Sequence, residues 1–162
     1  MLVLADKLNK LNFAQLMEVY AEGNEENGED MWPELNREQR LLRAEQAFYQ
    51  YLAEVFFLVP GAVYAIWEEN GTYVSALRLE PYEDGLLLEA LETAPQCRRR
   101  GYGEKLIRAV QDAFPQKIYS HVSKKNVPSL AIHKKCGFRQ VLHYAKYIDG
   151  SVARNAVTLQ YR

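Results

Sequence analysis

The chain has 162 residues, of which 48% are hydrophobic and 25% charged. This length suits one domain with its own core, residues 1–162, because a domain of ~150 residues buries ~70% of its unfolded surface. No apolar run approaches ~20 residues, and Asp6 comes too early for the apolar region of a signal peptide. The two cysteines, Cys97 and Cys136, form neither a C-x-x-C pair nor a zinc-ligand spacing. We therefore expect a cytoplasmic protein with reduced thiols, no membrane association and no metal site.

The net charge of −1 conceals two oppositely charged halves. Residues 1–94 hold 6 basic and 18 acidic residues, whereas residues 95–162 hold 14 basic and 3 acidic ones. A basic half attracts a polyanion, either a nucleic acid or a multiply phosphorylated small molecule. Attraction between the two halves within one fold accounts for the pattern equally well. The basic residues gather around a ligand-type loop without an aromatic–basic surface motif, so we expect no nucleic-acid partner.

The first third of the chain predicts a short strand and two helices. Residues 2–5 are apolar and form the strand candidate. Helices are predicted over 12–20 and 36–55, where apolar residues recur at helical spacing. Each begins with Asn and has Gln three residues later, which resembles a capping box. Between the helices, residues 22–34 are acidic and contain two glycines and a proline, which indicates a loop.

The middle of the chain is typical of antiparallel strands. Strands are predicted over 62–68 and 72–80, joined by Asn70-Gly71, which is the strongest hairpin signal in the chain. After a turn at residues 83–85, the third strand is expected over 86–94.

The rest of the chain alternates helices and strands. We expect helices over 101–114 and 127–136, a strand over 118–122, and a final pair of strands over 138–148 and 152–161. The whole is a mixed α/β fold, in which the sheet begins antiparallel and gains parallel pairs through crossover helices.

The segment Arg98-Arg99-Arg100-Gly101-Tyr102-Gly103 joins a predicted strand to a predicted helix. Glycines remove side chains where a ligand approaches the backbone, and the first N–H groups of a helix have no partner within it. Together with the helix dipole, they form an anion site for a phosphate or pyrophosphate. Taken alone, the segment is equally a tight turn with solvated arginines. It matches neither the dinucleotide fingerprint nor the P-loop.

Two motifs of this sequence resemble the GNAT superfamily of N-acetyltransferases. Residues 86–103 resemble the family's fourth strand and its R/Q-x-x-G-x-G/A signature, and residues 126–138 resemble its "N…lYeklGF" segment. The order of the predicted elements also fits, so the resemblance covers essentially the whole chain. It implies the GNAT acyl-CoA N-acyltransferase fold, a mixed, mostly antiparallel and splayed sheet flanked by helices.

The resemblance implies an enzyme that transfers an acetyl group from acetyl-CoA to a primary amine of a small molecule, peptide or protein. The amine attacks directly in a ternary complex, without a metal. Backbone N–H groups of the loop would bind the pyrophosphate, and the strand and Asn126 would bind the pantetheine arm. The residues expected to bind acetyl-CoA are Leu91, Thr93, Arg98, Arg99, Arg100, Gly101, Tyr102, Gly103, Asn126 and Lys135.

An amine is mostly protonated at neutral pH, so the reaction needs a general base. Our candidate is Glu89, which lies in the strand expected to hold the thioester. It is two residues from Leu91, so the alternation of a strand would place both side chains on one face. Glu92 would point to the opposite face and is the alternative base.

His133 stands where the family usually has the tyrosine that protonates the leaving thiolate. An imidazole, with a reference pKa of ~6.5, is able to supply that proton, and Tyr144 and Tyr147 on a nearby strand are alternatives. The missing tyrosine also supports a second hypothesis, a catalytically weak or inactive GNAT-fold domain that binds CoA and has a regulatory role.

In this family the acceptor is set by the early helices and residues 22–36 and 142–153. The acidic stretch would suit a polyamine or an aminoglycoside, or is simply solvated. Members of this family often form homodimers through their late strands, so the resemblance implies a possible homodimer.

Overall fold

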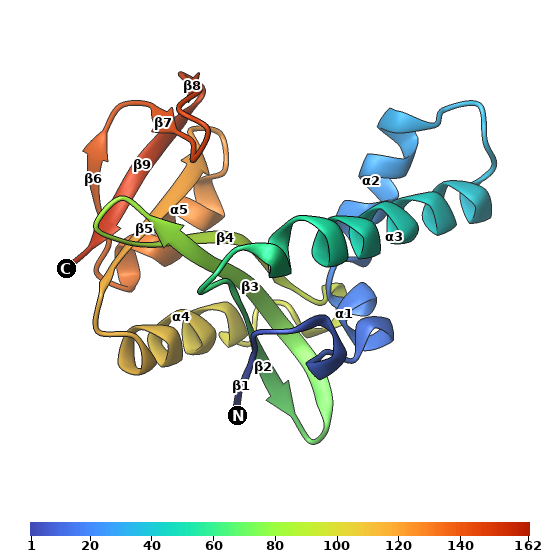
Figure 1. The fold of residues 1–162 in the computed structure, drawn as a ribbon, viewed down its shortest axis with the longest axis horizontal. Helices are drawn as coiled ribbons and strands as arrows, with labels where there is room; N and C mark the ends of the chain where they lie inside the picture. Colours follow the sequence, from blue (N-terminus) through green and yellow to red (C-terminus); the bar gives the residue numbers. More distant parts are fainter.

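The computed structural model describes all residues, 1–162. A seven-stranded sheet runs through it, and a two-stranded hairpin lies beside it (Figure 1). In chain order the strands are β1 (Leu2–Ala5), β2 (Val63–Glu69), β3 (Thr72–Tyr82), β4 (Gly85–Thr93), β5 (Lys117–Ser123), β6 (Arg139–Leu142), β7 (Ala145–Lys146), β8 (Val152–Ala153) and β9 (Ala156–Tyr161). The spatial order of the large sheet is β1-β2-β3-β4-β5-β9-β6, and β7 pairs with β8.

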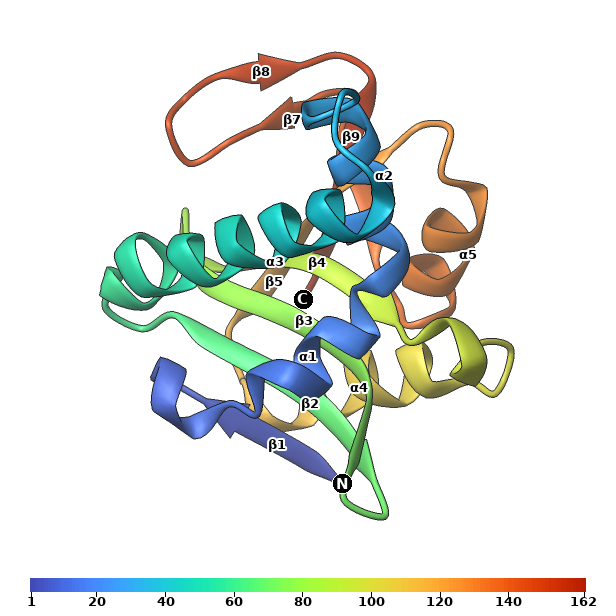
Figure 2. The ribbon, with the colours of Figure 1, turned by 90° about the vertical axis from the view of Figure 1, so that its right-hand side faces the viewer.

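Helices cover both faces of this sheet (Figures 1 and 2). One face carries α1 (Phe13–Val19), α2 (Ala21–Met31) and α3 (Arg37–Glu54), and the other carries α4 (Tyr102–Ala113) and α5 (Val127–Lys135). No helix has the length and apolar character needed to cross a bilayer. The mixed α/β architecture expected from the sequence is confirmed.

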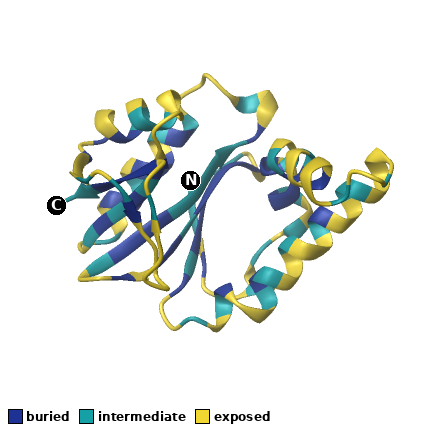
Figure 3. Cartoon of the chain, turned by 90° about the horizontal axis from the view of Figure 1, so that it is seen from above, coloured by how far each residue is buried: buried dark blue, intermediate teal, exposed yellow.

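Two hydrophobic cores follow from this layering. Leu106, Ile107 and Val110 recur at helical spacing, so α4 buries one apolar stripe against the sheet. On the other face, Leu16 of α1 and Leu52 of α3 are fully buried with residues of β2 and β3. Burial accordingly follows the strands and the inner sides of the helices, whereas the outer helix surfaces are exposed (Figure 3).

Several local predictions are confirmed. Asn36 and Gln39 form the complete capping box at the start of α3. Asn70 and Gly71 have φ values of 50° and 78°, as the two left-handed positions of a tight hairpin require. Asn12 caps α1, but the expected box is incomplete there, because the Gln15 side chain instead bonds the backbone at Gly71 and Tyr73.

The prediction of a loop over residues 22–34 is wrong, because α2 occupies Ala21–Met31. Its helix propensity is low, but contacts with α3 compensate. Glu25 pairs with Arg37 at 2.7 Å, and Arg40 Nε donates to the carbonyl of Trp32 at 3.1 Å. A Cβ on Gly28 would lie 3.0 Å from Arg40 Cβ, so this glycine allows the two helices to approach closely. Tertiary packing therefore overrides composition here.

The end of the chain also differs from expectation. The predicted strands over 138–148 and 152–161 are each broken, since β7 and β8 leave the large sheet as a separate hairpin around Gly150. In the first of these two segments, the pairing of β6 with β9 shifts register between Gln140 and Leu142, and the chain then leaves the large sheet. Several parallel pairs were also expected, but β4–β5 is the only one. After α5 the chain enters β6, which pairs antiparallel with β9.

Candidate functional site

Strands β4 and β5 separate half-way along their length. Their parallel pairing runs from Gly85–Lys117 to Leu88–Ser120 and stops. Beyond this point β4 continues against β3 to Thr93, and β5 continues against β9 to Ser123. The sheet is therefore splayed, and residues 89–93 lie along an opening between the two strands.

The loop that follows β4 presents unpaired backbone donors at the start of α4. None of the seven consecutive N–H groups from Arg98 to Glu104 donates to a protein acceptor, and the first helical bond is Lys105 N–H to the Gly101 carbonyl. Arg99 and Gly101 have left-handed φ values of 61° and 78°, which shape the loop. Together with the helix dipole, these donors make an anion-binding concavity.

Most of the residues expected to bind acetyl-CoA line one cavity of about 630 Å³ beside this loop, which we name the loop cavity. It brings together Leu91, Thr93, Arg98, Arg99, Gly101, Tyr102, Gly103 and Asn126. A Cβ on Gly103 would lie 3.0 Å from Ile132 Cδ1, so this glycine lets the start of α4 pack against α5.

Two of the expected residues lie outside the loop cavity. Arg100 is exposed, and the Lys135 ammonium pairs with Glu104 Oε2 at 2.7 Å. Arg98 lies at the cavity but also pairs with Glu22 of α2 at 2.7 Å. This pair joins the acidic and basic halves of the chain.

A β-bulge at Ala90 changes which side chains of β4 share a face. Arg78 pairs with Glu89 and Ala76 with Glu92, so β4 has one residue more than β3 between these pairs. Ala90 takes φ 54°, and alternation is lost at this point.

Two predictions about these faces are therefore wrong. Leu91 packs in the core on the α4 side, whereas Glu89 lies opposite Arg78, whose guanidinium rests 4.8 Å from the ring centroid of Tyr51 in α3. Glu89 and Leu91 thus do not share a face. Glu92 lines a cavity with Arg78 and Tyr51, on the same side as Glu89 rather than the opposite one.

Glu89 has the most perturbed carboxyl environment of the site. Burial, followed by the neighbouring Glu80 carboxyl, raises its pKa to about 8, and Arg78 acts in the opposite direction. Its Oε2 atom is buried without a hydrogen-bond partner. A carboxyl group with such a pKa is a strong base once it ionises, which is a property of catalytic sites.

Glu89 lines a small cavity of about 180 Å³ in the splay, which we name the histidine cavity. The cavity is also lined by His121 and His133. Buried side-chain atoms without a partner are few in this protein, yet Glu89 Oε2, His121 Nε2 and His133 Nε2 all belong to residues of this one cavity. The cavity thus brings one carboxyl group and two imidazoles together at the splay.

His133 is 1% exposed, and burial lowers its pKa. Its Nδ1 lies 2.7 Å from the carbonyl oxygen of Ser129, which can only accept, so Nδ1 carries the proton. In the neutral ring, Nε2 is then an acceptor. His133 is able to donate to a thiolate only after Nε2 takes up a proton, which burial disfavours.

His121 also lines the histidine cavity, and it was not proposed as a site residue from the sequence. It lies on β5, one residue after the last β4–β5 pair, and burial lowers its pKa. Its ring packs edge-on against Tyr82 and Tyr147, with ring centroids 5.4 and 5.2 Å away. The signal that could have identified His121 was its place in the strand that borders the splayed part of the sheet. Of the two alternative acids, Tyr147 packs against His121, although neither Tyr147 nor Tyr144 lines the cavity itself.

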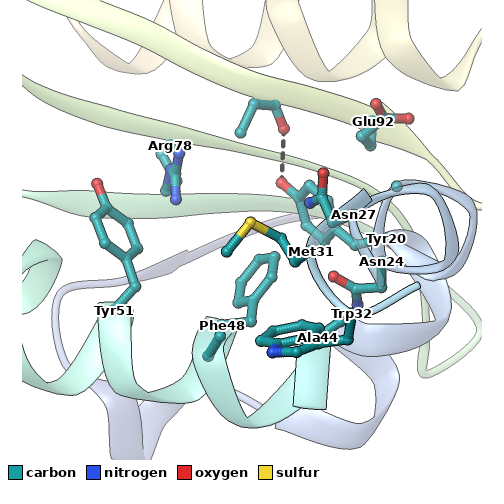
Figure 4. Close-up of a pocket in the computed structure, with 13 residues that line it drawn as sticks. Tyr20, Asn24, Asn27, Met31, Trp32, Ala44, Phe48, Tyr51, Arg78 and Glu92 are labelled. Carbon is teal, nitrogen blue, oxygen red and sulfur yellow. Dashed lines mark hydrogen bonds between the residues drawn. The ribbon is translucent and has the colours of Figure 1, made fainter. Parts of the chain in front are cut away.

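A third cavity, of about 520 Å³, lies between β3–β4 and the helices α2 and α3, and we name it the helix cavity (Figure 4). It shares Glu92 with the loop cavity and Ala90 with the histidine cavity. The bulge of β4 is thus the point at which the three cavities meet. Two molecules bound on the two sides of β4 would meet at this bulge.

A splayed sheet with an anion-binding loop beside the splayed strand defines an acyl-CoA N-acyltransferase fold. Solved structures share it over the whole chain. PaiA N-acetyltransferase from Thermoplasma acidophilum, in complex with coenzyme A, is 12% identical with a TM-score of 0.62, covering 100% of this chain and 99% of that one. Aminoglycoside 6'-acetyltransferase type Ii is 12% identical with a TM-score of 0.64, covering 99% and 96%. An acyl-CoA N-acyltransferase from Pseudomonas aeruginosa is 15% identical with a TM-score of 0.58, covering 100% and 99%.

Residues 18–138 match the model of the acetyltransferase (GNAT) family, and the chain belongs to that family. Among curated proteins it is similar to the peptidyl-lysine N-acetyltransferase YiaC of Escherichia coli K12. The two are 32% identical over 76 residues, which are 47% of this chain and 49% of YiaC. The similarity thus spans about half of each protein.

Proposed function

We propose that this protein transfers the acetyl group of acetyl-CoA to a primary amine by direct attack in a ternary complex. The observation that carries the proposal is the row of seven unbonded N–H groups, Arg98 to Glu104, next to the splayed part of β4. Such a row binds the pyrophosphate of coenzyme A. The family membership and the coenzyme A complex of the PaiA relative support the same substrate.

In our proposal the cofactor lies in the loop cavity, and its acyl end reaches the bulge. Arg98 and Arg99 add positive charge around the phosphates, and Asn126 lines both this cavity and the histidine cavity, where the pantetheine arm would pass. The Asn126 side chain also caps α5 by accepting from Ser129 N–H at 3.2 Å, so its position is held. The acceptor amine enters from the helix cavity.

We propose Glu89 as the general base. The ammonium of the acceptor loses a proton to the Glu89 carboxylate, directly or through water in the histidine cavity. The free amine then attacks the thioester carbonyl, the attacking nitrogen releases its second proton to water as the C–S bond breaks, and the coenzyme A thiolate takes up a proton. His133 is the proposed source of that proton, after protonation of Nε2. A His133→Phe variant that turns over at the wild-type rate at every pH would remove His133 from the mechanism.

The binding part of the proposal is tested by a matched pair of glycine variants. Gly101 and Gly150 have φ values of 78° and 85°, and a Cβ at either meets nothing within 4 Å. Alanine at each costs a similar ~1–2 kcal/mol of backbone strain. We expect Gly101→Ala to weaken acetyl-CoA binding in calorimetric titration, and Gly150→Ala to leave it unchanged. Equal affinities of both variants and wild type would contradict the proposed phosphate site.

A second candidate function is a CoA-binding domain without turnover. The buried neutral His133, in place of a tyrosine, is the observation that favours it. Release of the coenzyme A thiol, measured with a panel of amines, separates the two. Binding of acetyl-CoA without release for any amine would establish the second function.

A further inference from the structure

We infer that the acceptor is a small monoamine with an apolar body, an arylalkylamine or a branched alkylamine, and that its body occupies the helix cavity. The inference rests on the proposed function for the reaction, but it concerns the shape and chemistry of a different cavity. At about 520 Å³, this cavity has the size of a small-molecule site.

The walls of the helix cavity are apolar and aromatic. Met31 and Trp32 come from the end of α2, and Phe48 and Tyr51 come from α3, and their side chains surround one space (Figure 4). Such walls bind an aromatic or branched alkyl group by burying its surface and by ring–ring contact.

Polar side chains also line the cavity, among them Asn24, Asn27, Arg78 and Glu92. The Tyr20 hydroxyl is already bonded to the Ala90 carbonyl at 2.6 Å, the dashed line at Tyr20 in Figure 4. Arg78 lies at one end, where its guanidinium rests on the Tyr51 ring and its buried Nε has no partner. Glu92 lies at the other end, where the helix cavity joins the loop cavity. The only carboxylate that lines the cavity is therefore next to the bulge, where the amine would meet the thioester, and it lies 3.8 Å from the Arg98 guanidinium.

This arrangement fixes the orientation of the ligand. Its ammonium lies toward Glu92 and its apolar body toward Trp32 and Phe48. A polyamine would place a second ammonium, and an aminoglycoside several ammonium groups, in a cavity lined by one carboxylate and the cationic Arg78, which offers no second anionic partner.

The acidic side chains of α2 do not provide a second cation site within this cavity. Asn24, Asn27 and Gly23 are the polar or small residues that α2 contributes to its lining, and none of its glutamates lines it. Glu25 is paired with Arg37, and Glu22 with Arg98. Of the two alternatives for the acidic stretch, a site for a polyamine or aminoglycoside thus gains no carboxylate of α2 in the lining of the cavity.

The first test measures thiol release from acetyl-CoA with phenethylamine, spermidine, kanamycin and a lysine-containing peptide. We expect kcat/KM for phenethylamine to exceed the others by roughly tenfold or more, as one well-packed ring would provide. A higher kcat/KM for spermidine, kanamycin or the peptide would overturn the inference while leaving the acetyltransferase function intact.

Variants locate the binding site. Met31 is 67% exposed, so Met31→Lys should fold normally while placing a cation at the cavity. We expect Met31→Lys and Trp32→Ala to raise KM for phenethylamine roughly tenfold without changing the affinity for acetyl-CoA. Tyr49→Ala is the control, because Tyr49 lies on α3 beside Phe48 but packs against Phe13, outside the cavity. Equal KM values in all three variants would exclude this cavity.

A binding measurement separates this inference from the proposed reaction. Phenethylamine is titrated calorimetrically into protein saturated with coenzyme A. Binding that Met31→Lys weakens supports the inference even if no turnover occurs, in which case only the proposed reaction fails. Absence of both binding and turnover overturns the inference.

Discussion

The Tyr20 hydroxyl donates to the carbonyl oxygen of Ala90 at 2.6 Å. Tyr20 lies at the junction of α1 and α2, and Ala90 is the bulged residue of β4 with φ 54°. The bond therefore connects a wall of the helix cavity to the backbone segment at which the three cavities meet. The bond stabilises the bulge at a non-glycine residue whose left-handed conformation costs free energy.

We predict that Tyr20→Phe lowers both stability and activity. The change leaves the Ala90 carbonyl without its partner, which costs about 1–3 kcal/mol. The bulge should also become less ordered, so kcat should fall. Urea unfolding and thiol release measure the two effects. Tyr73→Phe is the control, because it removes the bond from Asn12 N–H to Tyr73 Oη, away from the bulge. A similar loss of kcat in both variants would contradict a specific role for Tyr20.

We predict that Glu89 controls the pH dependence of the reaction. With its pKa raised to about 8, Glu89 is largely protonated at neutral pH and ionises as the pH rises. Wild-type kcat/KM should therefore increase toward a plateau above about pH 8. Glu89→Gln should lower the rate by ~100-fold or more and remove this rise. A Glu89→Gln rate equal to wild type at every pH below 8 would exclude Glu89, and Glu92→Gln tests the alternative base in the same assay.

The raised pKa of Glu89 should also lower the free energy of unfolding as the pH rises. Its folded-state pKa lies above the usual value of 4.5, so the folded state holds its proton more tightly than the unfolded state. This stabilisation is fully present below about pH 4.5 and is lost as the pH rises through about 8. The free energy of unfolding of wild type should thus fall between pH 5 and pH 9, and less so for Glu89→Gln. Parallel pH profiles of the two proteins would argue against the raised pKa.

We predict a supporting role for His121 in proton transfer. His121 lines the same cavity as Glu89 and its Nε2 has no protein partner, so a water between the two side chains would carry the proton onward. His121→Phe keeps ring packing against Tyr82 and Tyr147 but removes the acceptor. We expect a lower kcat, less severe than for Glu89→Gln, with partial rescue by added imidazole.

The control for His121 is His143, which is exposed and bonded to Gln140 Nε2 at 3.0 Å. His143→Phe should leave kcat and its pH profile unchanged. If imidazole does not rescue His121→Phe, the side chain acts through packing and not through proton transfer.

Two glycines of α2 should respond oppositely to substitution. A Cβ on Gly28 would lie 3.2 Å from the Arg40 carbonyl oxygen, whereas one on Gly23 meets nothing within 4 Å. Gly28→Val should destabilise the protein by about 1–3 kcal/mol through overpacking. Gly23→Ala should stabilise it by about 0.5–1 kcal/mol, because alanine loses less entropy in a helix. Urea unfolding measures both, and destabilisation by Gly23→Ala would contradict the packing described.

The features that the sequence alone determined depend on neighbouring residues. The Asn36 cap, the Asn70-Gly71 hairpin and the glycines at 101 and 103 each need only a few adjacent positions to act. Hydrophobic periodicity likewise placed most helices and strands, and with the two motifs it led to the correct fold. In each case the physical cause is local.

What only the tertiary structure decided depends on residues far apart in the chain. The helix α2 exists because α3 packs against it, and the faces of Glu89, Leu91 and Glu92 follow from a bulge between β3 and β4. His121 enters the site because β5 separates from β4 at the residue before it. Alternation along a strand cannot reveal such changes, because a bulge and a splay are set by the pairing of distant segments.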